Sequence, residues 1–117
     1  MDRQNNATQK ALRLLGLAAR AGRTVVGVPL ICTALQRGAK DKTPLLVVEA
    51  ADSSANTHKR ITDRTAFYGV RRVRVDADCA ALALAVGKRD ALVAAVGVTE
   101  PHLAREIEAA LAATEQA

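Results

Sequence analysis

The side chains that could support catalysis cluster near the middle of the chain. Asp52 and Asp63 are carboxylates of the type that pair in acid–base catalysis, and Ser53 and Ser54 carry hydroxyls of the type that act as nucleophiles. Neither serine has a partnered base, and capping of the helix that follows accounts for Asp52 and both serines. Asp63 lies four residues after Lys59, which favours a solvent-exposed ion pair on one helix face. We therefore expect no catalytic residues and a protein that is not an enzyme.

Metal and nucleotide-cofactor sites lack support as well. His58 and His102 fall on separate predicted helices without ligand spacing, so both are predicted to be surface histidines. Cys32 and Cys79 have no CxxC spacing and no histidine nearby, which predicts reduced, partly buried thiols. No GxGxxG motif follows a predicted strand, and the sequence contains no P-loop motif. We expect neither a metal nor a cofactor.

Basic side chains are concentrated in the first part of the chain. Residues 1–74 carry a net charge of +9, whereas residues 75–117 carry −4. This asymmetry favours a polyanion as partner, with a basic surface that has no partner as the alternative. No apolar stretch is long enough to span a bilayer, and the polar start, residues 1–6, lacks a secretory hydrophobic region. We expect a cytoplasmic protein that does not bind membranes.

The elements that must position these residues alternate between helix and strand. A first helix, capped by Asn6 or Thr8, runs to about Ala21, and a last helix follows a Thr99 cap. Further helices are predicted at residues 29–37, 55–68 and 79–86, and strands at residues 24–26, 45–48, 70–75 and 92–98. This order predicts an α/β fold, a three-layer α/β/α sandwich with a small four-stranded mixed sheet. We expect residues 1–117 to form a single domain.

Five stretches follow one another in an order and at a spacing typical of one family. They are Leu14–Gly27, Leu45–Asp63, Tyr68–Val70, Leu82–Lys88 and Ala95–Glu100. Together they resemble the ribosomal-protein L-seven-Ae family, particularly its bacterial YlxQ-like branch, over about residues 9–112. The resemblance implies the same α/β/α sandwich and a non-catalytic, ribosomal-protein-like RNA-binding protein. Many family members bind kink-turn RNA, and this branch is associated with ribosome or translation functions.

The resemblance also implies two neighbouring RNA-binding regions. The first is the start of the second helix, where the family pattern is Gly-Thr-Asn-Glu-x-x-Lys. Gly27 matches the leading glycine, whereas Pro29, Leu30 and Thr33 replace the asparagine, glutamate and lysine. The second is the loop after the helix that ends at Gly87. The candidate RNA-binding residues are Gly27, Val28, Pro29, Leu30, Thr33, Arg37, Lys40, Lys88, Arg89, Ala91 and Leu92.

Several of these residues have an alternative interpretation. Gly27 is compatible with a simple tight turn, and Leu92 with the first residue of a core strand. Arg37, Lys40 and Lys42 fit a solvated loop equally well. Lys59, Arg60 and Arg64 fit an outer solvated helix face better than an RNA site.

Two functional hypotheses follow. The first is a monomer that binds a kink-turn or other structured RNA within a ribonucleoprotein of the translation apparatus, with ribosomal proteins as possible neighbours. The second is a protein-interaction module on the same fold that has lost kink-turn recognition, because Val28 to Ile31 are more apolar than the family pattern. A buried Leu30 would argue against the second hypothesis.

Overall fold

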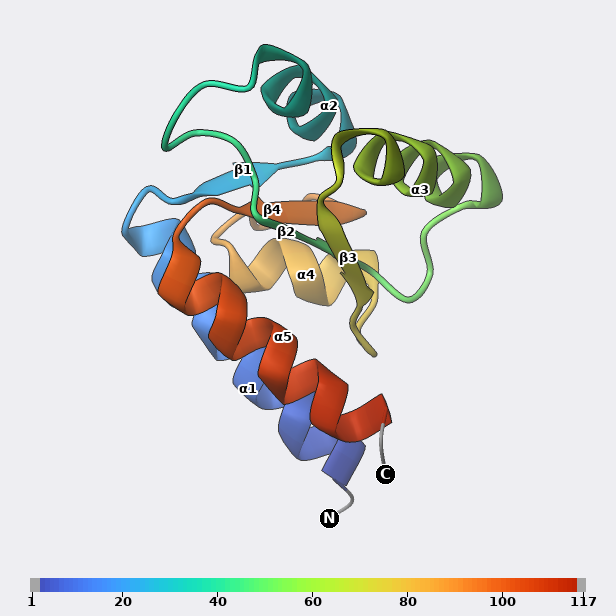
Figure 1. Ribbon diagram of the computed structural model, residues 1–117. Coiled ribbons are helices and arrows are strands. Elements are labelled where there is room, and N and C mark those ends of the chain that lie inside the picture. Colours follow the sequence, from blue (N-terminus) through green and yellow to red (C-terminus); the bar gives the residue numbers. More distant parts are fainter. Residues whose placement is uncertain (1–2, 116–117) are drawn as a thin grey trace.

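The computed structural model in Figure 1 describes residues 3–115, with side chains described for residues 6–112. Helices and strands alternate through this part of the chain. The helices are α1 (Arg3–Arg20), α2 (Val28–Arg37), α3 (Ala55–Tyr68), α4 (Cys79–Ala85) and α5 (Pro101–Glu115). The strands are β1 (Thr24–Val26), β2 (Leu46–Glu49), β3 (Arg71–Arg74) and β4 (Ala95–Val98).

The four strands form one mixed sheet in the order β1-β4-β2-β3. Strands β2 and β3 are parallel, and β4 is antiparallel to both β1 and β2. Helices α2 and α3 cover one face of the sheet, and α1, α4 and α5 cover the other (Figure 1). The predicted α/β/α sandwich and its mixed sheet are confirmed.

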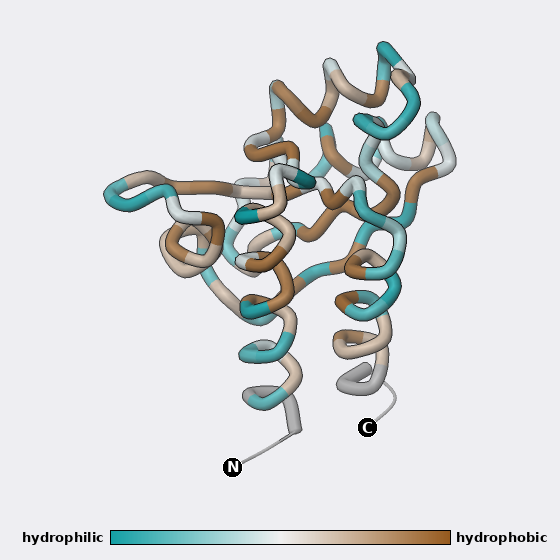
Figure 2. The backbone as a smooth tube through the Cα atoms, turned by 90° about the vertical axis from the view of Figure 1, so that its left-hand side faces the viewer, coloured by the Kyte–Doolittle hydropathy of each residue, from teal (hydrophilic) through white to brown (hydrophobic). Residues whose placement is uncertain are grey.

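The core follows directly from the apolar runs of the two central strands. Leu46 and Val48 pack with the helices α1, α4 and α5, whereas Val47 packs with α2 and α3. This alternation is the two-residue period of a strand, and all residues of β2 and β4 are buried. Figure 2 shows the hydrophobic residues following the strands through the middle of the molecule. The prediction of a strand buried on both faces is confirmed for β2.

Local capping signals set several helix ends as predicted. Ser54 accepts a hydrogen bond from the Thr57 amide at 3.2 Å and opens α3, and Asp78 accepts one from the Ala81 amide at 2.8 Å and opens α4. Gly69 closes α3 with a left-handed backbone, at φ 68°.

Three predicted boundaries are wrong. Helix α1 already begins at Arg3, so Asn6 and Thr8 do not cap it; Thr8 is buried inside the helix, on a face that packs toward the core. Thr99 is also buried, and the Glu100 carboxylate instead accepts the Leu103 amide at 2.7 Å at the start of α5.

The third wrong boundary is the start of the last strand. Strand β4 begins at Ala95 and not at Leu92, which is exposed. The chain is still in a loop at this point because Asp90 has a left-handed backbone, at φ 60°, and the Val93 amide donates to the Cys79 carbonyl at 3.1 Å.

Candidate nucleic-acid interface

The turn from β1 into α2 is built on Gly27. Its backbone has φ 94°, a conformation that L side chains rarely adopt. The Gly27 amide donates to the Ala95 carbonyl at 3.0 Å, and its carbonyl accepts the Ile31 amide at 3.0 Å. A Cβ added at Gly27 would meet nothing within 4 Å. The backbone therefore faces open space, where a ligand can approach it closely.

The amino end of α2 has no side-chain cap. The first amides of a helix have no acceptor within the helix, so this end favours an anion. Val28 is buried in the core, whereas Pro29 and Leu30 are exposed, Leu30 by 61%. The Thr33 hydroxyl donates to the Pro29 carbonyl at 3.1 Å and is satisfied within the helix. The surface offered here is thus backbone and apolar side chain, with no charged group in the first turn.

The loop between α4 and β4 forms the second part of the interface. Gly87 has a left-handed backbone, at φ 79°, and the Lys88 amide donates to the Ala83 carbonyl at 2.9 Å. Leu84 and Leu92 are both largely exposed, the latter by 78%. Together with the loop they line an open hollow of about 510 Å³, made by Ala80, Leu84, Lys88, Arg89, Asp90, Ala91 and Leu92.

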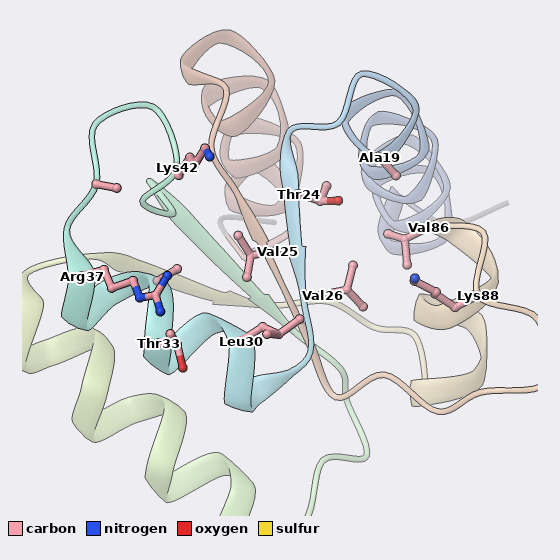
Figure 3. A pocket seen from close by; sticks show the side chains of 12 residues that line it. Ala19, Thr24, Val25, Val26, Leu30, Thr33, Arg37, Lys42, Val86 and Lys88 are labelled. Atoms are coloured by element: carbon pink, nitrogen blue, oxygen red, sulfur yellow. The ribbon is translucent and has the colours of Figure 1, made fainter.

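These two regions lie at the same end of the sheet. The Gly27 amide is hydrogen-bonded to the carbonyl of Ala95, the first residue of β4, and the α4–β4 loop leads directly into Ala95. Leu30 and Lys88 line a common groove of about 630 Å³ (Figure 3). The structure therefore brings together two segments that are far apart in the sequence.

Seven of the eleven candidate residues line the groove or the hollow, and the other four, Gly27, Val28, Pro29 and Lys40, line neither. Leu30, Thr33 and Arg37 of α2 line the groove, while Arg89, Ala91 and Leu92 line the hollow, and Lys88 borders both. Lys40 is exposed in the loop after α2 and lines neither of them.

A buried carboxylate that the sequence reasoning missed lies at the end of β2. The side chain of Glu49 is fully buried and accepts a hydrogen bond from Arg72 at 2.9 Å. His58 Nδ1 lies 2.8 Å from Glu49 Oε2, and the Ser53 hydroxyl donates to the same oxygen. Burial alone raises the pKa of Glu49. The hydrogen bonds from Ser53 and His58 and the charges of His58 and Arg72 outweigh burial and hold the pKa below its ordinary value.

This cluster corrects the prediction of a surface position for His58. Its side chain is 39% exposed and partly covered, because α3 begins beside the end of β2 and turns the ring onto Glu49. The signal in the sequence was a glutamate at the end of an otherwise apolar run. Ser53 donates to the carboxylate and not to the imidazole, so the group does not form a nucleophile–base pair.

Asp52 also has a different role from the predicted one. Its carboxylate accepts the Cys79 amide at 2.8 Å, so it stabilises the start of α4 and not of its own neighbour α3. The contact with Cys79 lowers the pKa of Asp52. Burial, followed by the hydrogen bond and charge of Asp52, raises the pKa of the Cys79 thiol to about 11, which keeps this thiol protonated and unreactive.

The predictions for the two cysteines, for His102 and for the Lys59–Asp63 pair agree with the structure. Both Cys32 and Cys79 are free and partly buried. His102 is exposed, and Lys59 pairs with Asp63 across one helical turn at 3.3 Å. Within the part of the chain that the structure describes, no group of three or more histidine, cysteine or acidic side chains could hold a metal ion. No helix in that part is long and apolar enough to cross a membrane.

The comparison with curated proteins finds two bacterial relatives. The chain is 39% identical over 83 residues to RNA-binding protein YlxQ of Bacillus subtilis (strain 168), covering 71% of this chain and 78% of the relative. It is 40% identical over 62 residues to RNA-binding protein YlxQ of Enterococcus faecium, covering 53% of this chain and 56% of the relative. The chain thus spans little more than half the length of the second relative. No family model matches the sequence.

Solved structures share the fold. A protein of unknown function from Bacillus halodurans C superposes with a TM-score of 0.77 at 29% identity, covering 88% of this chain and 97% of the other. The 15.5kD RNA binding protein of Giardia lamblia gives a TM-score of 0.74 at 18% identity, covering 92% of this chain and 89% of the other. At that identity the second likeness shows the fold alone.

Proposed function

Because this chain belongs to the YlxQ-like branch of the ribosomal-protein L-seven-Ae family, we propose that it binds structured RNA and catalyses no reaction. One observation carries the proposal. The Gly27 turn with the open end of α2, and the loop from Lys88 to Leu92, meet at one end of the sheet. This end offers backbone amides, cations and exposed leucines together, which are the groups that contact phosphates and unstacked bases.

The proposed mechanism divides the contacts between these groups. Lys88 and Arg89, with the amides of the first turn of α2, neutralise phosphates. Leu30 and Leu92 pack on bases that the RNA exposes, because both side chains are accessible to solvent.

We further propose that the RNA is a kink-turn or another bent element of the translation apparatus, bound in the cytoplasm by a single-domain monomer. The family relationship supports this assignment. Pro29, Leu30 and Thr33 leave α2 without the asparagine, glutamate and lysine of the family pattern, so recognition here relies on backbone and apolar contacts. Ribosomal proteins are the neighbours expected in such a ribonucleoprotein.

The deciding experiment measures affinity for three RNAs of equal length at 50 and 200 mM salt. They are a kink-turn, the same RNA with its G·A pairs replaced, and a plain duplex. We expect the kink-turn to bind most tightly and its affinity to fall about 40-fold over this range if three phosphates are contacted. Absence of binding to all three RNAs at both salt concentrations would refute the proposal.

Paired variants locate the site. Lys88→Ala with Arg89→Ala removes two cations from the α4–β4 loop. Arg60→Ala with Arg64→Ala removes two exposed cations from α3, outside the groove and the hollow. We expect the first pair to weaken RNA binding and to reduce the slope of log affinity against log salt concentration by about 2. The second pair should change neither the affinity nor this slope by much. Equal effects of the two pairs would mean that only overall charge matters.

A second candidate function, a protein-interaction module, is favoured by the exposure of Leu30. A buried Leu30 would have argued against such a role. The Leu30 side chain is instead exposed, beside an apolar groove. Protein binding and RNA binding share this surface and are compatible with one fold.

A further inference from the structure

Strand β1 is an edge strand whose outer side is open. In the antiparallel pair with β4, the Arg23 carbonyl accepts the Thr99 amide and the Gly27 amide donates to the Ala95 carbonyl, both at 3.0 Å. Backbone groups alternate in direction along a strand, so those of Thr24 and Val26 point away from β4. The edge thus presents two amides and two carbonyls at the spacing of a strand.

The groove described above runs along this edge and has a wall on each face of the sheet. Leu30 and Ala34 of α2 form one wall, and Ala19 and Val86, at the ends of α1 and α4, form the other. In Figure 3, β1 passes between these two groups of side chains. The groove is therefore a continuation of the sheet layer, with the helices of both outer layers standing beside it.

A further strand placed here would find suitable surroundings for its side chains. Successive side chains of a strand point to opposite faces, so they would reach both apolar walls in turn. The groove also carries cations, namely Arg37, Lys42 and Lys88, and none of the described side chains that line it is acidic. The charge of this rim complements acidic groups on either side of a short apolar core.

We propose that the free edge of β1 binds an extended segment of a partner protein, with apolar residues at its centre and acidic residues on both sides, as a fifth strand. The backbone of the segment pairs with Thr24 and Val26, and its flanking carboxylates meet Arg37, Lys42 and Lys88. This is strand addition, in which main-chain hydrogen bonds supply affinity and side-chain walls supply selectivity. It goes beyond RNA binding, and because Leu30 and Lys88 belong to both sites, the two partners compete.

The other occupants fit the groove less well. In a symmetric pair of β1 edges, the same basic groups of two copies would face each other, and like charges across paired strands are unfavourable. RNA would use the cations but would leave the row of strand-spaced amides and carbonyls between two apolar walls unused.

The test uses a labelled peptide, acetyl-Glu-Asp-Val-Ile-Val-Asp-Glu-amide, with the charge-reversed acetyl-Lys-Lys-Val-Ile-Val-Lys-Lys-amide as control. We expect the acidic peptide to bind at least about tenfold more tightly than the basic one. We also expect it to shift the NMR signals of the Thr24 and Val26 amides. No binding of the acidic peptide, or shifts confined to other surfaces, would overturn the proposal.

Val26→Pro tests the backbone contact directly. It removes an outward amide and leaves the hydrogen bonds of β1 to β4 in place, a position where edge strands accept proline. Val26→Ala is the matched control, because it shortens the same side chain and keeps the amide. We expect Val26→Pro to weaken peptide binding about tenfold and Val26→Ala less than threefold. Equal effects would refute strand addition.

A charge-reversal variant keeps the test independent of proline. Arg37→Glu with Lys42→Glu should invert the preference, so that the basic peptide binds more tightly than the acidic one. An unchanged preference would refute the proposal. Sedimentation that depends on protein concentration and is abolished by Val26→Pro would instead assign the edge to a second copy. If the original protein binds no peptide and Val26→Pro lowers its RNA affinity, the β1 edge belongs to the RNA site. In that case the peptide proposal fails while the RNA-binding proposal stands.

Discussion

The carboxylate of Glu49 accepts a hydrogen bond from the guanidinium of Arg72 at 2.9 Å, in a place where the Glu49 side chain is fully buried. Parallel pairing of β2 with β3 sets Arg72 beside Val47, so its side chain shares the α3 face of the sheet with Glu49. His58 supplies a second contact from α3 at 2.8 Å. A buried charge with these partners ties β2, β3 and α3 together.

The first prediction concerns stability in acid. The partners hold the pKa of Glu49 below its ordinary value of 4.5, so the unfolded chain takes up a proton at higher pH than the folded one does. The contribution of Glu49 is complete above about pH 4.5 and is lost as pH falls further, through the folded pKa. Urea unfolding between pH 7 and pH 3 should show a shallower decline for Glu49→Gln than for the original protein. Parallel curves would contradict this.

The second prediction concerns the loss of Arg72. Arg72→Met leaves the buried Glu49 carboxylate without its permanent cation and should lower the free energy of unfolding by about 3 kcal/mol. Arg71→Met is the control, because Arg71 is exposed and its pair with Glu108 is a surface ion pair worth at most about 1 kcal/mol. Chemical denaturation of both variants checks the difference, and similar losses would show that the Arg72 pair is not special.

The third prediction concerns Gly97, in the middle of β4. A Cβ at this position would lie 2.8 Å from Cγ of Pro44, a ring that cannot rotate away. Gly97→Ala should therefore lower the free energy of unfolding by about 2 kcal/mol. Pro44→Gly in the same chain removes both the Cγ and the Cβ that the new Cβ would meet at 2.8 and 2.9 Å. This relieves the clash, so the double variant should lose at least about 1 kcal/mol less than the sum of the single variants. An additive result would mean that the backbone absorbs the clash.

Elements that carry local signals could be predicted from the sequence. Strand β2 was predictable because three consecutive apolar residues serve both faces of a sheet, and α3 because Ser54 and Gly69 are local signals at its two ends. Leu92 was assigned to a strand because it adjoins an apolar run, and nothing local marks the left-handed turn at Asp90 before it.

Partners distant in sequence were not predictable from local patterns. Asp52 accepts a hydrogen bond from the Cys79 amide and Glu49 accepts one from Arg72, and both contacts depend on which strands are neighbours. The presence of Leu30 and Lys88 in one groove likewise depends on the pairing of β1 with β4. Only the family resemblance placed those two residues in one region before the strand order was known.

The fourth prediction concerns base contacts in the RNA complex. Leu92→Ser should lower RNA affinity about fivefold, because it removes apolar surface worth about 1 kcal/mol when a base covers it. Leu45→Ser is the control: Leu45 is also exposed, but it precedes β2 at the opposite end of the sheet, where its amide bonds to Val98. Both changes lie on the surface and should leave stability unaltered. Equal affinities of the two variants would exclude the α4–β4 loop from the site.

The fifth prediction concerns a variant in which the polar side chains of the family pattern are restored. Pro29→Asn, Leu30→Glu and Thr33→Lys, made together, fall on exposed positions of α2 and should be tolerated. Their hydrogen bonds to the edges of the G·A pairs should raise the preference for an intact kink-turn over its G·A-replaced form by about tenfold or more. Alanine at the same three positions removes the original side chains without adding polar groups, and should not raise it. If the polar variant folds normally and its preference stays unchanged, the end of α2 does not contact those base pairs.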